Sequence, residues 1–159
     1  PGAGPRHMAF SPDGRFAYVL NELGSTLTLC RWNAAEGVLT EVETASTLPP
    51  GHRGRSHAAA LRVSLDGRRV YASNRGHDLV LRCEAVPERG VLRPRGWTPS
   101  GGRNPREIAL EPDGGALWAA NEESDTLQRF TIAPATGDLT PAGPPVLSGS
   151  PVSLLFRAV

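Results

Sequence analysis

Two pairs of polar residues flank two apolar runs near the start of this sequence. In "GPRHMAFSPDGRFAYVLNE", residues 4–22, Arg6 and His7 precede the first run, and Asn21 and Glu22 follow the second. Arginine can grip a carboxylate or phosphate with paired hydrogen bonds or stabilise a developing negative charge. Glutamate and histidine can accept a proton from water. If these side chains meet, they form a candidate site for an anionic small molecule.

The turn between the runs determines whether they meet. Asp13-Gly14 between apolar runs predicts a β-hairpin, because glycine accepts a positive φ without steric cost. Pairing residues outward from this turn brings Arg6 opposite Asn21, with Glu22 one step further out. The run over 16–20 is apolar without alternation, which predicts a strand covered on both faces.

The same hairpin occurs three times, as "SPDGRFAYVLNE", "SLDGRRVYASNR" and "EPDGGALWAANE". The copies align without a gap on Asp13, Asp66 and Asp113, so the period is about 50 residues. A period of this length built from short strands and turns predicts a β-propeller with one four-stranded antiparallel blade per repeat. Chance similarity among glycine-rich hairpins explains the many matched columns less well.

We therefore expect an all-β chain with repeats at about 4–50, 56–100 and 103–148, followed by a closing strand at 151–157. In the first repeat, the expected strands are 6–11, 16–21, 26–32 and 38–45. Because three blades and one strand do not close a ring, we expect the chain to be the C-terminal part of a single propeller domain. The whole protein would be roughly twice this length, and the missing N-terminal blades would be its structural partners.

Composition and motif spacing argue against several other classes of protein. There are 17 basic and 16 acidic residues, and the basic ones are scattered, so nucleic acid is not an expected partner. No apolar run approaches a membrane span, and no signal-peptide pattern is present. Cys30 and Cys83 occupy equivalent repeat positions, which favours buried free thiols over a disulfide and fits the cytoplasm. No cysteine and histidine spacing is typical of a zinc site.

In a propeller, residues that enter the first strand and leave the second lie at the mouth of the central channel. The three repeats place there Arg6, His7, Asn21 and Glu22; Asn74, Arg75, His77 and Asp78; and Arg106, Glu107, Asn121 and Glu122. Two interpretations stay open, an anion-binding site or structural pairing of each arginine with a neighbouring carboxylate. For the asparagines, a turn-stabilising role is the alternative. The second repeat has Ala58–Ala60 at its entrance, so an arginine there is not required to build a blade.

The connection "STLPPGHRGRSH", between the first two repeats, contains His52, Arg53, Arg55 and His57. Its proline and glycine content predicts an exposed loop. A solvated basic connector explains it better than direct ligand binding.

Several motifs resemble the seven-bladed propeller lactonase family, which includes bacterial 6-phosphogluconolactonases and is related to a fungal muconate cyclase. They are "GPRHMAFSPDGRFAYVLNEL", "VYASNRGHD", "NPREIALEPDG", "AANEESDTLQRF" and "SPVSLLF". The resemblance implies hydrolysis of 6-phosphoglucono-δ-lactone in the pentose phosphate pathway, without a metal or organic cofactor. Leu79 departs from the serine that is usual in the family, and Ala60 lies near a position that is usually acidic; both differences bear on the substrate.

From the residues and the resemblance together, the expected catalytic residues are Arg6, His7, Glu22 and Arg75. The expected substrate-binding residues are Arg106, His77, Asn21, Asn74 and Asn121. The expected substrate is a small anionic lactone. A lactonizing cyclase and a non-catalytic binding propeller are the alternative functions.

Overall fold

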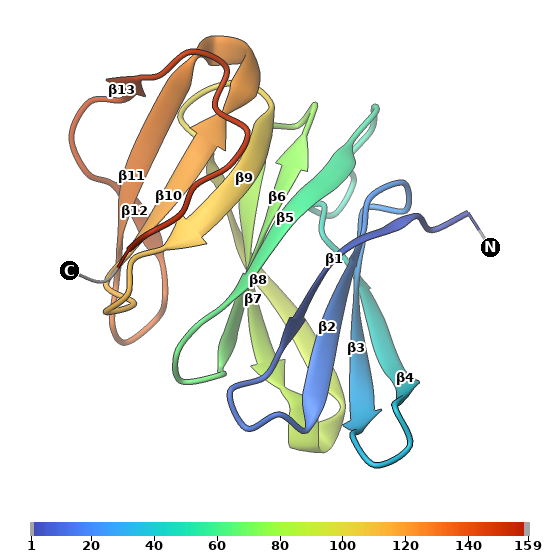
Figure 1. Cartoon of the computed structure of the whole chain (residues 1–159). Coiled ribbons are helices and arrows are strands. Elements are labelled where there is room, and N and C mark those ends of the chain that lie inside the picture. Colours follow the sequence, from blue (N-terminus) through green and yellow to red (C-terminus); the bar gives the residue numbers. More distant parts are fainter. Residues whose placement is uncertain (1, 158–159) are drawn as a thin grey trace.

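Each Asp-Gly turn joins the first two strands of an antiparallel sheet, and three such sheets lie side by side in the computed structural model, which describes residues 2–157 (Figure 1). The first sheet has the order β1 (Pro5–Phe10), β2 (Phe16–Asn21), β3 (Thr26–Asn33) and β4 (Val38–Ser46). The second has the order β5 (His57–Val63), β6 (Arg69–Arg75), β7 (Leu79–Val86) and β8 (Val91–Pro99). The third contains β9 (Pro105–Leu110), β10 (Ala116–Asn121), β11 (Thr126–Ile132), β12 (Leu139–Pro141) and β13 (Val146–Leu147). The expectation of four-stranded antiparallel blades is confirmed.

The outer edge of the third sheet differs from this pattern. Both β12 and β13 pair with β11, at opposite ends of that strand. The segment between them contains Pro144 and Pro145, which lack the N–H group needed for a continuous ladder. The side chain of Gln128 on β11 instead donates to the carbonyl oxygen of Gly143 at 3.2 Å. Within the described residues, helix is limited to two single 3₁₀ turns, Pro87–Arg89 and Glu122–Ser124.

The hairpin turns have the conformation that the Asp-Gly pairs predict. Gly14, Gly67 and Gly114 have φ values of 68°, 70° and 73°. In that region a side chain would be strained, so the recurring glycine has a physical cause. Beyond the turn, Phe10 pairs with Ala17 and His7 with Leu20, as the expected register requires.

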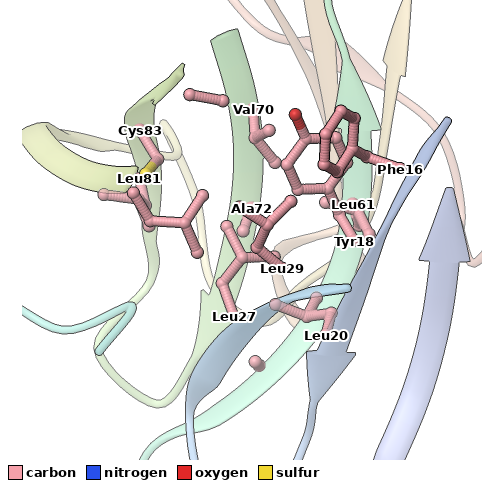
Figure 2. Packing of buried hydrophobic residues seen from close by; sticks show 13 residues of the cluster. Phe16, Tyr18, Leu20, Leu27, Leu29, Leu61, Val70, Ala72, Leu81 and Cys83 are labelled. Carbon is pink, nitrogen blue, oxygen red and sulfur yellow. The ribbon is translucent and has the colours of Figure 1, made fainter. Parts of the chain in front are cut away.

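The sheets pack face to face, and β5, β6 and β7 of the middle sheet each contribute to two cores. Val70 and Ala72 on β6 face the first sheet, where they join Tyr18 and Leu29 in one buried cluster (Figure 2). Tyr71, between them in sequence, belongs to the second cluster with residues of the third sheet. This alternation follows from the two-residue period of a strand. Burial on both faces explains the unbroken apolar runs in the sequence.

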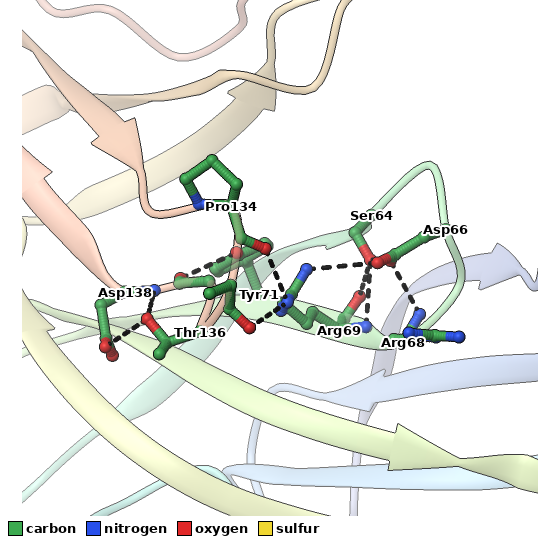
Figure 3. A network of polar contacts seen from close by, with 10 residues as sticks. Ser64, Asp66, Arg68, Arg69, Tyr71, Pro134, Thr136 and Asp138 are labelled. Carbon is green, nitrogen blue, oxygen red and sulfur yellow. Dashed lines mark hydrogen bonds and ion pairs between the residues drawn. The ribbon is translucent and has the colours of Figure 1, made fainter.

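A polar network ties the second sheet to the third (Figure 3). The hydroxyl of Tyr71 donates to the carbonyl oxygen of Gly137 at 2.9 Å. Arg69 donates to the carbonyl oxygens of Pro134 and Ala135 at 3.1 and 2.9 Å. The turn after β11 is therefore bound to the neighbouring sheet through its backbone.

Three other expectations concern the cysteines, membrane spans and the C-terminal segment. Cys30 and Cys83 are both buried and free, as predicted, and burial raises the pKa of Cys83 to about 12. No helix in the described part of the chain is long and apolar enough to cross a membrane. Residues 151–157 form no strand in this structure, so their role as a closing strand stays a prediction.

Candidate active site

The site forms on the first strands of the three sheets. β5 lies between β1 and β9 and contacts both. In β1, Pro5 pairs with Asn21 and His7 pairs with Leu20, so Arg6 is an extra, bulged residue. The expectation that Arg6 lies opposite Asn21 is therefore wrong by one position, because the bulge shifts the register.

The other two inner strands are bulged at the same repeat position. In β9, Arg106 lies between Pro105, which pairs with Asn121, and Glu107, which pairs with Ala120. In β5 the bulge falls between Ala58 and Leu61. A bulge bends the strand and re-aims a side chain, and such features are common next to active sites. Here two of the three bulges carry an arginine.

Arg6 is held by three groups: its neighbour on β1, a carbonyl oxygen on β5 and the glutamate that follows β2. Its Nη1 donates to Nε2 of His7 at 2.9 Å and also to the carbonyl oxygen of Ala59 on β5. Its Nε lies 3.8 Å from Oε2 of Glu22. Since arginine can only donate, Nε2 of His7 must accept, which requires the neutral imidazole.

Glu22 joins Arg6 to the next blade. Nη2 of Arg75, on β6, donates to Oε1 of Glu22, while Oε2 faces Arg6. The side chain of Glu22 is 32% exposed and that of Arg75 is 15% exposed, so the carboxylate is partly accessible to solvent. The structure thus brings together all four expected catalytic residues, Arg6, His7, Glu22 and Arg75.

Burial and neighbouring charges set the protonation states of Glu22, His7 and Arg6. Burial by itself would raise the pKa of Glu22, but the hydrogen bond from Arg75 and the charges of Arg75 and Arg6 together lower it. Burial lowers the pKa of His7, and the neighbouring Arg6 lowers it further. Burial, followed by the charge of Arg75, also lowers the pKa of Arg6. At neutral pH the cluster therefore contains a carboxylate, a neutral imidazole and two guanidinium groups.

One ion pair below this cluster was not anticipated from the sequence. Nη2 of Arg62, on β5, lies 3.0 Å from Oε1 of Glu107, on β9. Both charges act on His7, where Glu107 raises the pKa and Arg62 lowers it. The only sequence signal for Arg62 was a charged residue inside the otherwise apolar strand "HAAALRV". Its repeat counterparts are Ala9 and Ala109, so the repeat pattern drew no attention to it.

The third blade contributes a second arginine and carboxylate. Nη1 of Arg106 lies 3.3 Å from Oε2 of Glu122. The same carboxylate oxygen accepts a hydrogen bond from Nδ2 of Asn104 at 2.9 Å. Arg106 is 39% exposed, more than Arg6 or Arg75. It therefore has the most accessible of the three expected mouth guanidinium groups.

The asparagine column is engaged within the blades. Asn21 donates to the hydroxyls of Thr26 and Thr28 on β3. Asn74 is fully buried; it accepts from the hydroxyl of Thr47 and donates to that residue's carbonyl oxygen. These contacts favour the structural interpretation of the asparagines.

The third member of the column, Asn121, is also fully buried and donates to the carbonyl oxygen of Ser100 at 3.1 Å. Its Oδ1 is buried without a hydrogen-bond partner among the described residues. Like the other two, this side chain donates its amide hydrogens to nearby protein groups.

His77 lies apart from the arginine cluster, against the connection between the first two blades. Its ring centroid is 4.3 Å from that of His52, with an interplanar angle of 52°. Nε2 of His52 is buried without a hydrogen-bond partner among the described residues. The pair fixes the connection against the turn that precedes β7, so its geometry favours a structural role over substrate binding.

No group of three or more histidine, cysteine, aspartate or glutamate side chains in the described residues is placed to hold a metal ion.

Repeated antiparallel four-stranded sheets, packed face to face with their first strands together, define this chain as part of a β-propeller. Residues 1–156 match the family described as "Lactonase, 7-bladed beta-propeller". The chain belongs to this family.

Relatives with named activities support the same assignment. The chain is 37% identical over 140 residues to 6-phosphogluconolactonase of Bacillus subtilis, which covers 88% of the chain and 40% of that protein. It is 35% identical over 140 residues to 6-phosphogluconolactonase of Pectobacterium carotovorum, covering 88% of the chain and 42% of that protein. The structure of the periplasmic gluconolactonase of Pseudomonas aeruginosa superposes with a TM-score of 0.92 at 37% identity. That match covers the whole chain and 44% of the neighbour, so the chain spans less than half the length of these relatives.

Proposed function

We propose that the full-length protein hydrolyses a sugar δ-lactone, and that the lactone is 6-phosphoglucono-δ-lactone, opened to 6-phosphogluconate in the pentose phosphate pathway. The observation that carries this proposal is the carboxylate of Glu22 held between Arg75 and Arg6. Relatives named 6-phosphogluconolactonase support the choice of substrate.

In the proposed reaction, Oε2 of Glu22 orients a water molecule and accepts its proton as the water attacks the lactone carbonyl carbon. Its lowered pKa keeps Glu22 ionised at neutral pH, although it also makes the carboxylate a weak base. A weak base is adequate here, because δ-lactones already hydrolyse in water. The ring C–O bond then breaks, and the departing ring oxygen takes up the proton that Glu22 accepted, which gives the hydroxy acid and restores the carboxylate.

Arg6 stabilises the negative charge that develops on the carbonyl oxygen. Its position next to Glu22 places a cation beside the attacked carbon, and its hydrogen bonds to His7 and Ala59 hold it in place. His7 thus acts as a positioning residue for Arg6 in this proposal, because its accepting nitrogen is already occupied. Arg75 fixes the orientation of Glu22 from the other side.

The test is an assay of the full-length protein against a panel of small molecules. The panel contains 6-phosphoglucono-δ-lactone, glucono-δ-lactone and a carboxylated muconate, and ring opening is followed by acid release above the spontaneous rate. Accelerated opening of the sugar lactones supports the proposal. Turnover of the muconate alone would point to a cyclase, and turnover of none would point to a binding propeller.

For the compartment, we propose the cytoplasm. The two free buried cysteines favour a reducing environment. Fractionation of cells that produce the full-length protein tests this, and recovery in the periplasm would contradict it.

A further inference from the structure

We infer that Arg106, rather than Arg75, binds the phosphate of the substrate and makes the site selective for phosphorylated lactones. This inference rests on the proposed function, and it names the residue that decides between the two kinds of sugar lactone. A sugar lactone has no free carboxylate, because its carboxyl carbon is part of the ring ester. A second anion-binding group is therefore needed only when the substrate carries a phosphate.

Arg106 occupies the same position in the third blade as Arg6 does in the first blade. Both arginines are bulged residues of the first strand, and each faces the glutamate at the end of the second strand of its own blade. In the second blade, Arg75 occupies the position of these glutamates, so its charge is opposite. Arg6 and Arg106 therefore occupy equivalent positions, but they differ in their contacts with other protein groups and in their exposure.

Arg6 and Arg75 are already committed to protein groups. Within residues 2–157 Arg6 has three partners, whereas Arg75 is bonded to Glu22, is only 15% exposed, and has a buried Nε without a hydrogen-bond partner. Arg106 has a single contact, at 3.3 Å, and is 39% exposed. Its other N–H groups have no hydrogen-bond partner within residues 2–157. Those groups are free to form the paired hydrogen bonds that arginine makes with phosphate.

Release of Arg106 would not leave Glu122 without a partner. Nδ2 of Asn104 donates to the same carboxylate at 2.9 Å, and Asn104 is itself fixed through its backbone N–H, which donates to Asp78. Arg106 can therefore exchange Glu122 for a ligand phosphate while the carboxylate keeps a hydrogen bond. An Arg75 that left Glu22 would instead disorganise the proposed base.

The middle blade has no arginine at the position of Arg6 and Arg106. At the position equivalent to the two arginines, β5 has Ala59, and the next residue is Ala60. Both alanines are fully buried, so at this position the middle blade adds no charged side chain beside the two arginines. Arg106 is also near enough that its charge helps to lower the pKa of Arg6, after burial and Arg75. A lactone bound at Arg6 therefore has a second and more exposed guanidinium near it, that of Arg106.

The experiment compares Arg106→Gln with the wild type in the full-length protein on 6-phosphoglucono-δ-lactone and glucono-δ-lactone. Loss of charge-assisted hydrogen bonds should lower kcat/KM for the phosphorylated lactone about 10- to 100-fold, mainly through KM. The value for glucono-δ-lactone should change less than about threefold. Arg103→Gln is the matched control, since it removes the same charge from the preceding loop, where Arg103 hydrogen-bonds to Glu123 and Ser124. Equal losses on both lactones, or no loss on either, would overturn the inference.

A binding measurement separates this inference from the proposed reaction. By calorimetry, 6-phosphogluconate should bind the wild type more tightly than gluconate does, and Arg106→Gln should remove the difference. If the wild type opens no lactone but this pattern holds, the reaction is wrong and the phosphate subsite stands. If Arg106→Gln, with an unchanged melting temperature, binds 6-phosphogluconate as the wild type does, the subsite is refuted even where lactone hydrolysis is found.

Discussion

The hydrogen bond between Arg6 and His7 predicts an unusual effect of pH on activity. Nε2 of His7 accepts from Nη1 of Arg6, so only the neutral imidazole supports this contact. Protonation would turn the acceptor into a donor and place two cations side by side. Arg6 would then lose one of the three groups that hold it, and we expect lactone hydrolysis to fall as a result.

The direction and size of the effect follow from the pKa of His7, which burial and Arg6 lower from its ordinary value of 6.5. Because the pKa is lowered, His7 is neutral above pH 6.5, and we expect full activity there. Activity is lost as the pH falls through the lowered pKa, by about tenfold for each further pH unit. Any stability that depends on neutral His7 is lost over the same range.

His7→Gln tests this because glutamine has an amide oxygen that can accept from Arg6 but cannot be protonated in this range. The variant should keep kcat/KM at pH 8 within about threefold and should lack the acidic limb of the pH profile. His7→Ala, without an acceptor, should be impaired at every pH. His57→Gln, which alters an exposed histidine nearby, should keep the limb. If His7→Gln showed the same limb as the wild type, the positioning role of His7 would be refuted.

Two further predictions concern the blade interfaces. Tyr71→Phe should lower the free energy of unfolding by about 1–2 kcal/mol, because it leaves the buried carbonyl oxygen of Gly137 unpaired. Tyr18→Phe, at the equivalent position, should cost almost nothing, since the Tyr18 hydroxyl has no partner among the described residues; equal losses in urea titrations would contradict this assignment. Cys30 and Cys83 should resist a thiol reagent in the native state and react on unfolding, because burial raises the pKa of both thiols. Fast labelling of Cys83 in the native protein would show that the interface opens.

Repetition made the fold predictable from the sequence. Three aligned hairpins, each with an apolar run that does not alternate, required sheets buried on both faces, and β2 and β6 are buried in this way. The strand bounds and the register up to His7 followed from the Asp13-Gly14 turn. The split edge of the third sheet was missed, although its prolines were visible, because the pattern was carried over from the other two repeats.

The site was predictable only in part. The topology of a propeller brought Arg6, Glu22 and Arg75 together, but the bulge that aims Arg6 depends on backbone geometry rather than on residue type. A bulge inserts one residue without changing the apolar pattern further along the strand. Arg62 was missed because its counterparts are alanines. Charge spacing alone also could not separate Arg106 from Arg75, since their difference lies in exposure and in competing partners.

Glu22→Gln in the full-length protein tests the central claim most directly. The substitution keeps the volume and an oxygen that can accept from Arg75, but it removes the charge and the base. We predict that kcat for 6-phosphoglucono-δ-lactone falls about 10²- to 10⁴-fold while KM changes much less and the melting temperature stays close to that of the wild type. Glu123→Gln is the control. It makes the same change at an exposed glutamate of the third blade, and it should leave kcat unchanged. If Glu22→Gln kept kcat/KM within about threefold of the wild type, the cluster of Arg6, Glu22 and Arg75 would be structural, and the catalytic groups would lie elsewhere.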